Sequence, residues 1–288
     1  MAYEFRVDAI SGRGLRRIAR QQLRLLGRDL HDRADAANGH HEARKCLKRL
    51  RALLMLARPA IGKARWAKLD RRLSDAAQAL SGPRDDTVVL QTLEHLGREH
   101  GEAALGAAGR RLLRSLGKRP ASANTAGATL TEFTPGLAKI GKLFDDLPLK
   151  AFDADTALDG LEADYAAGRR QLRHAYRAQT SEMFHALRKH VQRHWRHMHL
   201  FGAAWPSEFG ARIELARTVS ELLGREHDFW LLRERLDKDG AALDELCQQH
   251  QATLRAAAKA PLELLFAEPH EALRTRLAAY WSAASTTE

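Results

Sequence analysis

The sequence has little of what secreted, membrane-spanning and zinc-binding proteins need. It contains two cysteines in 288 residues, Cys46 and Cys247, and neither stands in a CxxC or Cys/His spacing typical of a zinc site. It has no run of about 18 apolar residues, and its first ten residues lack the apolar core of a signal peptide. We therefore expect reduced thiols and a cytoplasmic protein without a membrane-spanning helix.

Signatures of common catalytic sites are also missing. The sequence contains no HExxH, GxSxG or GxxxxGK pattern and no carboxylate-rich metal cluster. Asp85 and Asp228 each follow an expected break in the chain, and we interpret them as caps of the helices they open. Either carboxylate could instead brace a neighbouring basic side chain. We expect a protein that is not an enzyme and needs no cofactor.

Strand signals are scarce, and helical periodicity runs along most of the chain. Ala, Leu, Arg and Glu are abundant, whereas Val, Ile and Tyr are few, which favours helices. We predict a loop over 118–136 and helices over 12–30, 39–58, 64–81, 85–100, 102–117, 136–145, 156–178, 181–201, 207–223, 228–239, 241–258 and 269–284. Helices of this length with short joints predict antiparallel bundles.

The charge is strongly unbalanced towards the positive sign. Lys and Arg number 47 against 36 Asp and Glu, which gives a formal net charge of +11 and a pI near 10.0. Such a surplus indicates an acidic partner, which could be a nucleic acid, an anionic membrane or a polyphosphate. Composition alone does not choose among them.

An internal repeat organises these charges. One segment reads HEARKCLKRLR and a later one reads HALRKHVQRHWR. Four basic positions recur with identical spacing: His41, Arg44, Lys45 and Arg49 return as His185, Arg188, Lys189 and Arg193. An RRxxR pattern precedes each segment, at 16–20 and 169–173, and the landmarks LSGPRD (80–85) and LGREHD (223–228) follow them. The chain therefore reads as two copies of one helical unit.

Each repeated helix has an apolar side and an almost purely cationic side. An ordinary solvent-exposed face mixes both signs, because like charges at i,i+4 destabilise a helix by roughly 0.2–0.5 kcal/mol per pair. A cationic face that occurs twice therefore indicates a bound polyanion. His41 and His185 open the two faces, and both could donate to phosphate, more strongly at mildly acidic pH. A neutral histidine that hydrogen-bonds within the bundle is the alternative.

These repeated segments resemble the CHAD domain, the conserved histidine α-helical domain. The resemblance extends over about 10–284 and includes the ending LFAEP at 265–269 and LAAYW at 277–281. It implies an all-α fold of two antiparallel helical bundles related by a pseudo-twofold internal repeat, with a basic central groove or pore. It makes 1–284 a single domain, with a first repeat at 10–118, a linker with a short helix at 119–155, and a second repeat at 156–284. No Glu-x-Glu-x-Lys strand of a CYTH domain is present, so a stand-alone CHAD protein is expected.

The resemblance also implies binding of inorganic polyphosphate and association with polyphosphate granules in the cytoplasm. Carried over to this chain, the binding residues are His41, Arg44, Lys45, Lys48, Arg49, His185, Arg188, Lys189, Arg193 and Arg196. Arg17, Arg20, Arg170 and Arg173 are second-tier candidates. Arg84 and His227 of the later landmarks could also reach the anion. Gln192 stands where the first repeat has Lys48, which weakens the second site and breaks the symmetry of charge.

Two other interpretations stay open. Weak, non-specific nucleic-acid binding is the main alternative, although Trp195 is the one aromatic residue within either basic face, and single-strand recognition normally adds aromatic stacking. A metal could be shared by His190, His194 and His197, but they lie on the apolar side of their helix and the first repeat has no matching trio. We therefore expect no metal site.

Overall fold

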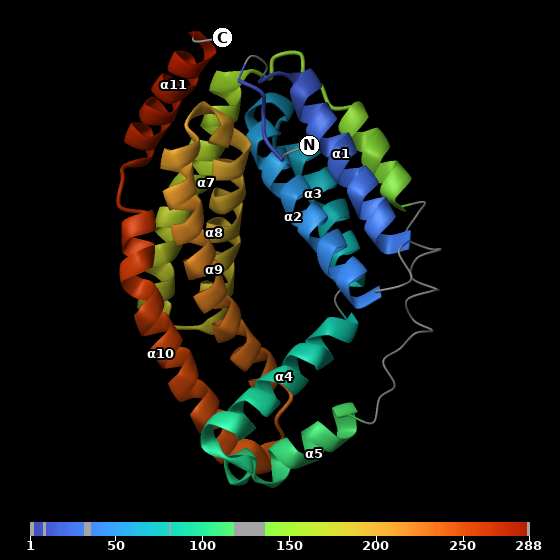
Figure 1. The fold of residues 1–288 in the computed structure, drawn as a ribbon, viewed down its shortest axis with the longest axis vertical. Helices are drawn as coiled ribbons and strands as arrows, with labels where there is room; N and C mark the ends of the chain where they lie inside the picture. The colour runs from blue at the N-terminus through green and yellow to red at the C-terminus, as the bar shows by residue number, and fades with distance from the viewer. Residues whose placement is uncertain (1–2, 8–9, 32–35, 81, 118–135, 287–288) are drawn as a thin grey trace.

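The computed structural model describes residues 3–7, 10–31, 36–80, 82–117 and 136–286, which form helices and short joints without a strand (Figure 1). The helices are α1 (Gly12–His31), α2 (Ala36–Ile61), α3 (Lys63–Ala79), α4 (Gly82–His100), η1 (Glu102–Leu105), α5 (Gly106–Gly117), α7 (Ala154–Ala178), α8 (Ser181–Phe201), η2 (Gly202–Ala204), α9 (Pro206–Arg233), η3 (Lys238–Gly240), α10 (Ala241–Leu265) and α11 (His270–Thr286). Residues 136–145 are also helical. The all-α class is thus confirmed. The predicted loop over 118–135 lies outside the described residues.

Most predicted helices are present, but one predicted break is wrong. The sequence predicts separate helices over 207–223 and 228–239, whereas α9 continues from Pro206 to Arg233 without a break. Asp228 therefore lies inside a helix and is not a cap. Gly224 suggested a break, but it lies buried inside α9 and leaves room for a neighbouring side chain. A Cβ atom at this position would lie 2.8 Å from the guanidinium of Arg188. In the first half, the corresponding landmark does separate α3 from α4, and Asp85 lies in the first turn of α4.

Two hydrophobic clusters hold these helices together. The larger cluster joins α1, α2, α3, α7, α8 and α11 with the first part of α9 and the end of α10. The smaller cluster joins α4, η1 and α5 with the end of α9 and with α10, through residues such as Val89, Leu93, Phe229 and Leu243. In Figure 1, α4 and α5 accordingly lie beside α9 and α10, away from α1–α3. Among the helices of the first half, α4 therefore packs on α9, whereas α1–α3 pack on one another and α2 packs on α7 and α8.

Both cysteines are buried, one in each cluster, and they form no disulfide. Burial raises the pKa of the Cys46 thiol to about 11 and that of Cys247 to about 12. Both side chains are therefore neutral thiols at pH 7 and behave as small apolar groups. No described helix is both long enough and apolar enough to cross a membrane.

Glycine allows α7 to approach α2 closely. A Cβ atom at Gly160 would lie 2.6 Å from the carbonyl oxygen of Leu56 and 2.8 Å from that of Met55. These are backbone atoms, so a side chain at Gly160 can be accommodated only if one helix moves. The close approach fixes α2, and hence its cationic side, relative to the second half of the chain.

We predict that Gly160→Ala lowers the free energy of unfolding by about 1–3 kcal/mol, because the added methyl group overpacks the α2–α7 contact. Urea unfolding followed by circular dichroism measures the change. Gly27→Ala in α1 is the matched control, since nothing lies within 4 Å of its Cβ position. The control should retain or slightly gain stability. Equal stability of the two variants would contradict this account of the contact.

Candidate anion-binding cavity

A cavity of about 510 Å³ lies between α2, α3 and α4 on one side and α8 and α9 on the other. Seven Lys and Arg side chains and three Asp side chains line it, so the lining carries a formal surplus of positive charge. The seven cations are Arg44, Lys48, Arg51, Arg188, Lys189, Arg193 and Arg196. His185 and His227 lie among them. Helices from both halves of the chain thus contribute cations to one space.

Helical spacing places these side chains on one side of α2. Arg44, Lys48 and Arg51 follow one another at i, i+4 and i+7 and all line the cavity, while Leu47 and Leu50 between them are fully buried. The charged side faces the cavity because the apolar side is held in the larger hydrophobic cluster.

The same division holds for α8. Thr180 caps this helix by accepting a hydrogen bond from the backbone N–H of Met183, 3.4 Å away, which fixes the first turn just before His185. His185, Arg188, Lys189, Gln192 and Arg196 then line the cavity in successive turns, and Leu187 and Val191 are buried behind them. Both cationic sides therefore meet across the cavity.

Acidic side chains hold two of the guanidinium groups. Arg51 donates two hydrogen bonds to Asp70 of α3, at 2.8 and 3.0 Å. Arg193 donates from Nε to both carboxylate oxygens of the buried Asp164 of α7, at 3.0 and 2.9 Å. Burial raises the pKa of Asp164, but Arg193 and His190 outweigh it and hold that pKa below its ordinary range. These pairs fix each guanidinium while leaving part of its fork of donors exposed to the cavity.

Two other guanidinium groups are held by the backbone. Arg44 donates to the carbonyl oxygen of Leu80 at 3.3 Å. Arg196 donates to the carbonyl oxygen of Gln192 at 2.6 Å and lies over the Trp195 ring, 5.2 Å from its centroid. Neither contact neutralises the positive charge, so the field in the cavity remains cationic.

His185 and His227 form a stacked pair on the wall of the cavity. Their ring centroids are 4.2 Å apart with an interplanar angle of 28°, and His227 also stacks on Trp230. The Nδ1 atoms of both histidines are buried without a hydrogen bond to any described residue. Burial and the neighbouring cations lower the pKa of His185 to about 3 and that of His227 to about 4. Both rings are therefore neutral at pH 7.

Burial and neighbouring cations also lower the pKa values of two other lining residues. Burial, together with Arg51 and Arg193, lowers the pKa of Lys189. Burial lowers the pKa of Arg196 to about 10, with smaller contributions from Arg49 and Arg188. A bound anion would reverse these shifts, because it favours the charged form of every group around it.

Half of the fourteen predicted binding residues line the cavity. The predicted residues that do so are Arg44, Lys48, His185, Arg188, Lys189, Arg193 and Arg196. Lys45 instead pairs with Glu42 at 2.6 Å, and Arg49 donates to Gln22 at 3.4 Å on the α1 side of its helix. His41 is exposed near the start of α2 and is not a lining residue.

The second-tier arginines also lie away from the cavity lining. Arg17 donates to the backbone carbonyl of Glu4 at 3.0 Å, and Arg20 pairs with Asp145 at 2.9 Å. Arg170 and Arg173 are exposed on α7. The RRxxR pattern therefore did not identify residues that line the cavity.

Sequence reasoning missed Arg51 and gave His227 only a secondary place. Arg51 continues the spacing of Arg44 and Lys48 by one more turn, so extending the helical wheel would have found it. His227 comes from α9, and only the packing of α9 against α8 brings it to His185. The side chain of Arg84, the other landmark residue, lies outside the described part of the chain.

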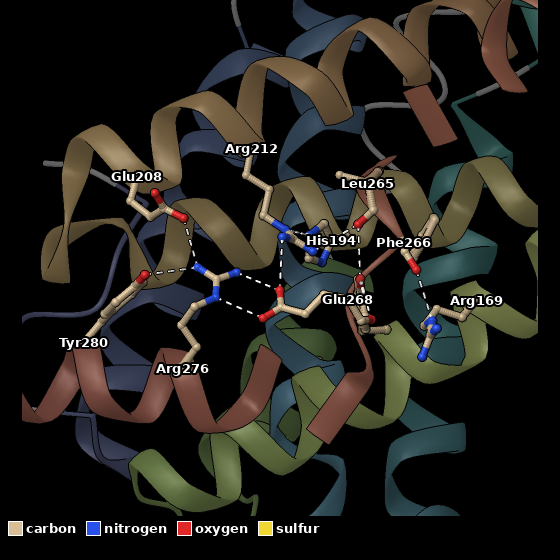
Figure 2. A network of polar contacts seen from close by, with 10 residues as sticks. Arg169, His194, Glu208, Arg212, Leu265, Phe266, Glu268, Arg276 and Tyr280 are labelled. Carbon is tan, nitrogen blue, oxygen red and sulfur yellow. Dashed lines mark hydrogen bonds and ion pairs between the residues drawn. The ribbon is translucent and has the colours of Figure 1, made fainter. Parts of the chain in front are cut away.

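The three clustered histidines of α8 do not gather around one point. His190 lies 3.0 Å from Asp164, and His197 lies 3.0 Å from the carbonyl oxygen of Ala52. His194 accepts from Arg212 at 2.8 Å, and Figure 2 shows that Arg212 also reaches Glu268 and the carbonyl oxygen of Leu265. Each ring thus hydrogen-bonds to a different neighbouring segment, which explains why these histidines lie on the apolar side.

Fold and cavity together define an all-helical protein with a cationic cavity between segments from its two halves. The family model of the CHAD domain matches residues 14–237, which is more than half of the chain. The chain therefore belongs to the CHAD domain family. The match ends before the LFAEP and LAAYW segments, so it does not include them. A comparison with curated proteins gives no match.

The histidine pKa values predict a loss of stability in acid. His185, His227 and the buried His197, whose pKa burial lowers to about 4, all bind protons less readily in the folded chain than the ordinary value of 6.5 implies. The unfolded chain therefore takes up more protons below that pH, and the free energy of unfolding falls as the pH drops from about 6.5 to 4. Urea unfolding at pH 7, 6 and 5 measures this slope.

A matched pair of variants tests whether these histidines cause the pH dependence of the free energy of unfolding. His227→Asn removes one of the depressed groups and should flatten the dependence, whereas the exposed His174→Asn should leave it unchanged. Stability that stays level or rises on acidification would show that these rings are not held neutral.

Proposed function

We propose that this protein binds inorganic polyphosphate in the cavity between α2 and α8. The observation that carries the proposal is the meeting of Arg44 and Lys48 from α2 with Arg188 and Lys189 from α8 around one space. Burial and the neighbouring cations lower the pKa values of His185 and Lys189, and a bound anion would favour the charged forms of both groups. The CHAD family is associated with polyphosphate binding, and the membership of this chain supports the same ligand.

A long anion suits this lining better than a single phosphate. The lining residues of α8 extend from His185 to Arg196, which corresponds to about 16 Å along a helix. Three arginine forks and one lysine point charge lie along that length, so successive phosphates of one chain can each find a donor. His185 and His227 can add hydrogen-bond donors when the anion raises their pKa. The affinity for the anion would then be higher at mildly acidic pH.

We further propose that the two basic helices are equivalent parts of two repeats. In this view 10–118 and 156–284 are helical bundles related by a pseudo-twofold axis, joined by a linker at 119–155 within one domain over 1–284. The cavity is then the basic central groove, with α2 and α8 on its opposite sides. We also propose that the protein associates with polyphosphate granules and that it binds polyphosphate without acting on it as an enzyme.

Nucleic acid is a weaker candidate for this cavity. Trp66 is the one aromatic residue among the described lining residues, and Arg58 already lies over its ring, 4.9 Å from the centroid. Trp195, the aromatic residue of the basic face, donates to His199 at 3.0 Å and is not a lining residue. Single-stranded nucleic acid normally gains affinity from bases stacked on aromatic rings, and a polyphosphate needs none.

We predict that Lys48→Glu together with Lys189→Glu weakens binding of long-chain polyphosphate by about 100-fold or more at physiological salt, since two charge-assisted contacts are lost and two repulsions added. Isothermal titration calorimetry measures the affinity, with orthophosphate and duplex DNA as competitors. The control is Arg170→Glu with Arg173→Glu, which changes the net charge equally on the exposed surface of α7.

The two outcomes are distinct. Tight binding that resists DNA, is lost in the lysine variant and persists in the arginine control places the ligand in the cavity. Equal loss in both variants, or displacement by equal phosphate concentrations of DNA, would mean that the ligand binds the general positive surface, and the nucleic-acid alternative would then be favoured.

Gly224 allows a second test that changes no charge. A methyl group at this position overlaps the guanidinium of Arg188, so Gly224→Ala should displace Arg188 and weaken polyphosphate binding by about tenfold. Gly210→Ala lies in the same helix with nothing within 4 Å of its Cβ position, and it should leave the affinity unchanged. Calorimetric titration of both variants compares them directly. Unchanged affinity in Gly224→Ala would remove Arg188 from the proposed site.

A further inference from the structure

A second group of titratable side chains lies away from the cavity, where the end of α4 meets α10. His100 is the last residue of α4, and its Nε2 lies 2.8 Å from the Nε2 of His250 in α10. The Glu99 carboxylate lies 3.9 Å from the same nitrogen of His100. One potential ligand atom from each of the three residues lies within 4.8 Å of the others. We propose that Glu99, His100 and His250 bind a divalent transition-metal ion, with zinc as the best fit.

The geometry is close to that of a zinc site. Two nitrogen ligands at Zn–N distances of about 2.0–2.1 Å in a tetrahedral site are separated by about 3.3 Å. The two Nε2 atoms reach that separation if the side chains move apart by about half an ångström. Their rings meet edge to face, with an interplanar angle of 74°, and the two Nε2 atoms lie 2.8 Å apart.

Neighbouring groups orient the three proposed ligands. The His250 ring stacks on Phe229 of α9, with centroids 4.9 Å apart and an interplanar angle of 15°, which restricts its rotation. His95 lies one turn before Glu99, and its Nε2 lies 3.1 Å from the carboxylate oxygen Oε2 without forming a hydrogen bond. The other oxygen, Oε1, is the one nearest His100. Such supporting contacts are typical of metal sites, where they fix the orientation of the ligands.

The surroundings also suit a cation. The α4 helix ends at His100, and Gly101 follows with a φ of +81°, so the negative end of the helix dipole lies at the proposed site. The side chains of His100 and Glu99 are 34% and 45% exposed, so an ion can enter and water can complete a tetrahedral set.

A second cluster of histidine and glutamate side chains among the described residues is less suitable for binding a metal ion. Glu162, His270 and Glu271 also lie within 4.8 Å of one another. There, however, Arg274 lies 3.5 Å from the Glu162 carboxylate and occupies the place of a cation. That cluster is therefore a matched control with the same kinds of side chain.

A bound metal would connect the two halves of the chain at the far end of α4. Gln91 of the same helix lines the cavity nine residues before His100, which is about 14 Å along the axis. The ion would hold α4 against α10 and so fix the position of this cavity wall. This metal site is separate from the cavity, and it does not depend on which anion the cavity binds.

The test uses the full chain after chelator treatment and dialysis, titrated with Zn²⁺ alone in a buffer without phosphate. We expect one zinc ion per chain by calorimetry, and binding weaker by about tenfold or more in His100→Gln and in His250→Gln. His270→Gln in the control cluster should bind zinc as the unaltered chain does. Circular dichroism of each variant checks that the helices are retained.

Cobalt substitution provides a readout that requires no variant. Co²⁺ added to the chelator-treated chain should give the intense visible absorption of a tetrahedral site with nitrogen ligands, and Zn²⁺ should abolish it. Absence of stoichiometric binding, or binding that survives both His100→Gln and His250→Gln, would overturn the proposal. The two imidazoles would then share a hydrogen bond and nothing more.

Discussion

The structure depends on holding two cationic helix faces opposite each other. The α2 and α8 helices turn their charged sides towards one cavity because their apolar sides are buried in the larger hydrophobic cluster. Burial, with smaller contributions from the neighbouring cations, lowers the pKa values of His185, Lys189 and Arg196. Packing of the apolar sides therefore outweighs the repulsion of the charged sides, and a bound anion would remove the conflict.

Two carboxylates, the buried Asp164 and the partly buried Asp70, relieve part of that repulsion. Asp164 of α7 lies beneath Arg193 and His190, and Asp70 of α3 holds Arg51. A buried ion pair contributes little net stability, but the loss of one partner is costly because a charge is left without compensation. These acidic residues therefore fix the direction of the guanidinium groups more than they strengthen the fold.

The α9 helix connects the cavity to the region where α4 and α10 meet. Its first half belongs to the larger cluster and its last turns to the smaller one, where α4 and α10 meet. His227 lies between the two regions and stacks on both His185 and Trp230. An uninterrupted helix links the cavity to the His100–His250 contact, and this requires that Gly224 does not end it. Because Gly224 has no side chain, α9 continues through this position and the guanidinium of Arg188 still fits beside it.

The helical class, most helix positions and the cationic sides of α2 and α8 could be predicted from the sequence. These properties follow from a periodicity of about 3.6 residues, which acts between near neighbours in the chain. Which of these charges meet depends on how the helices pack. The packing turns Arg49 towards Gln22 and brings His227 to His185. Sequence spacing also gave no role to His100, because its partner His250 lies 150 residues further along the chain. Such contacts depend on how whole helices pack, and no local pattern of residues encodes the packing of one helix on another.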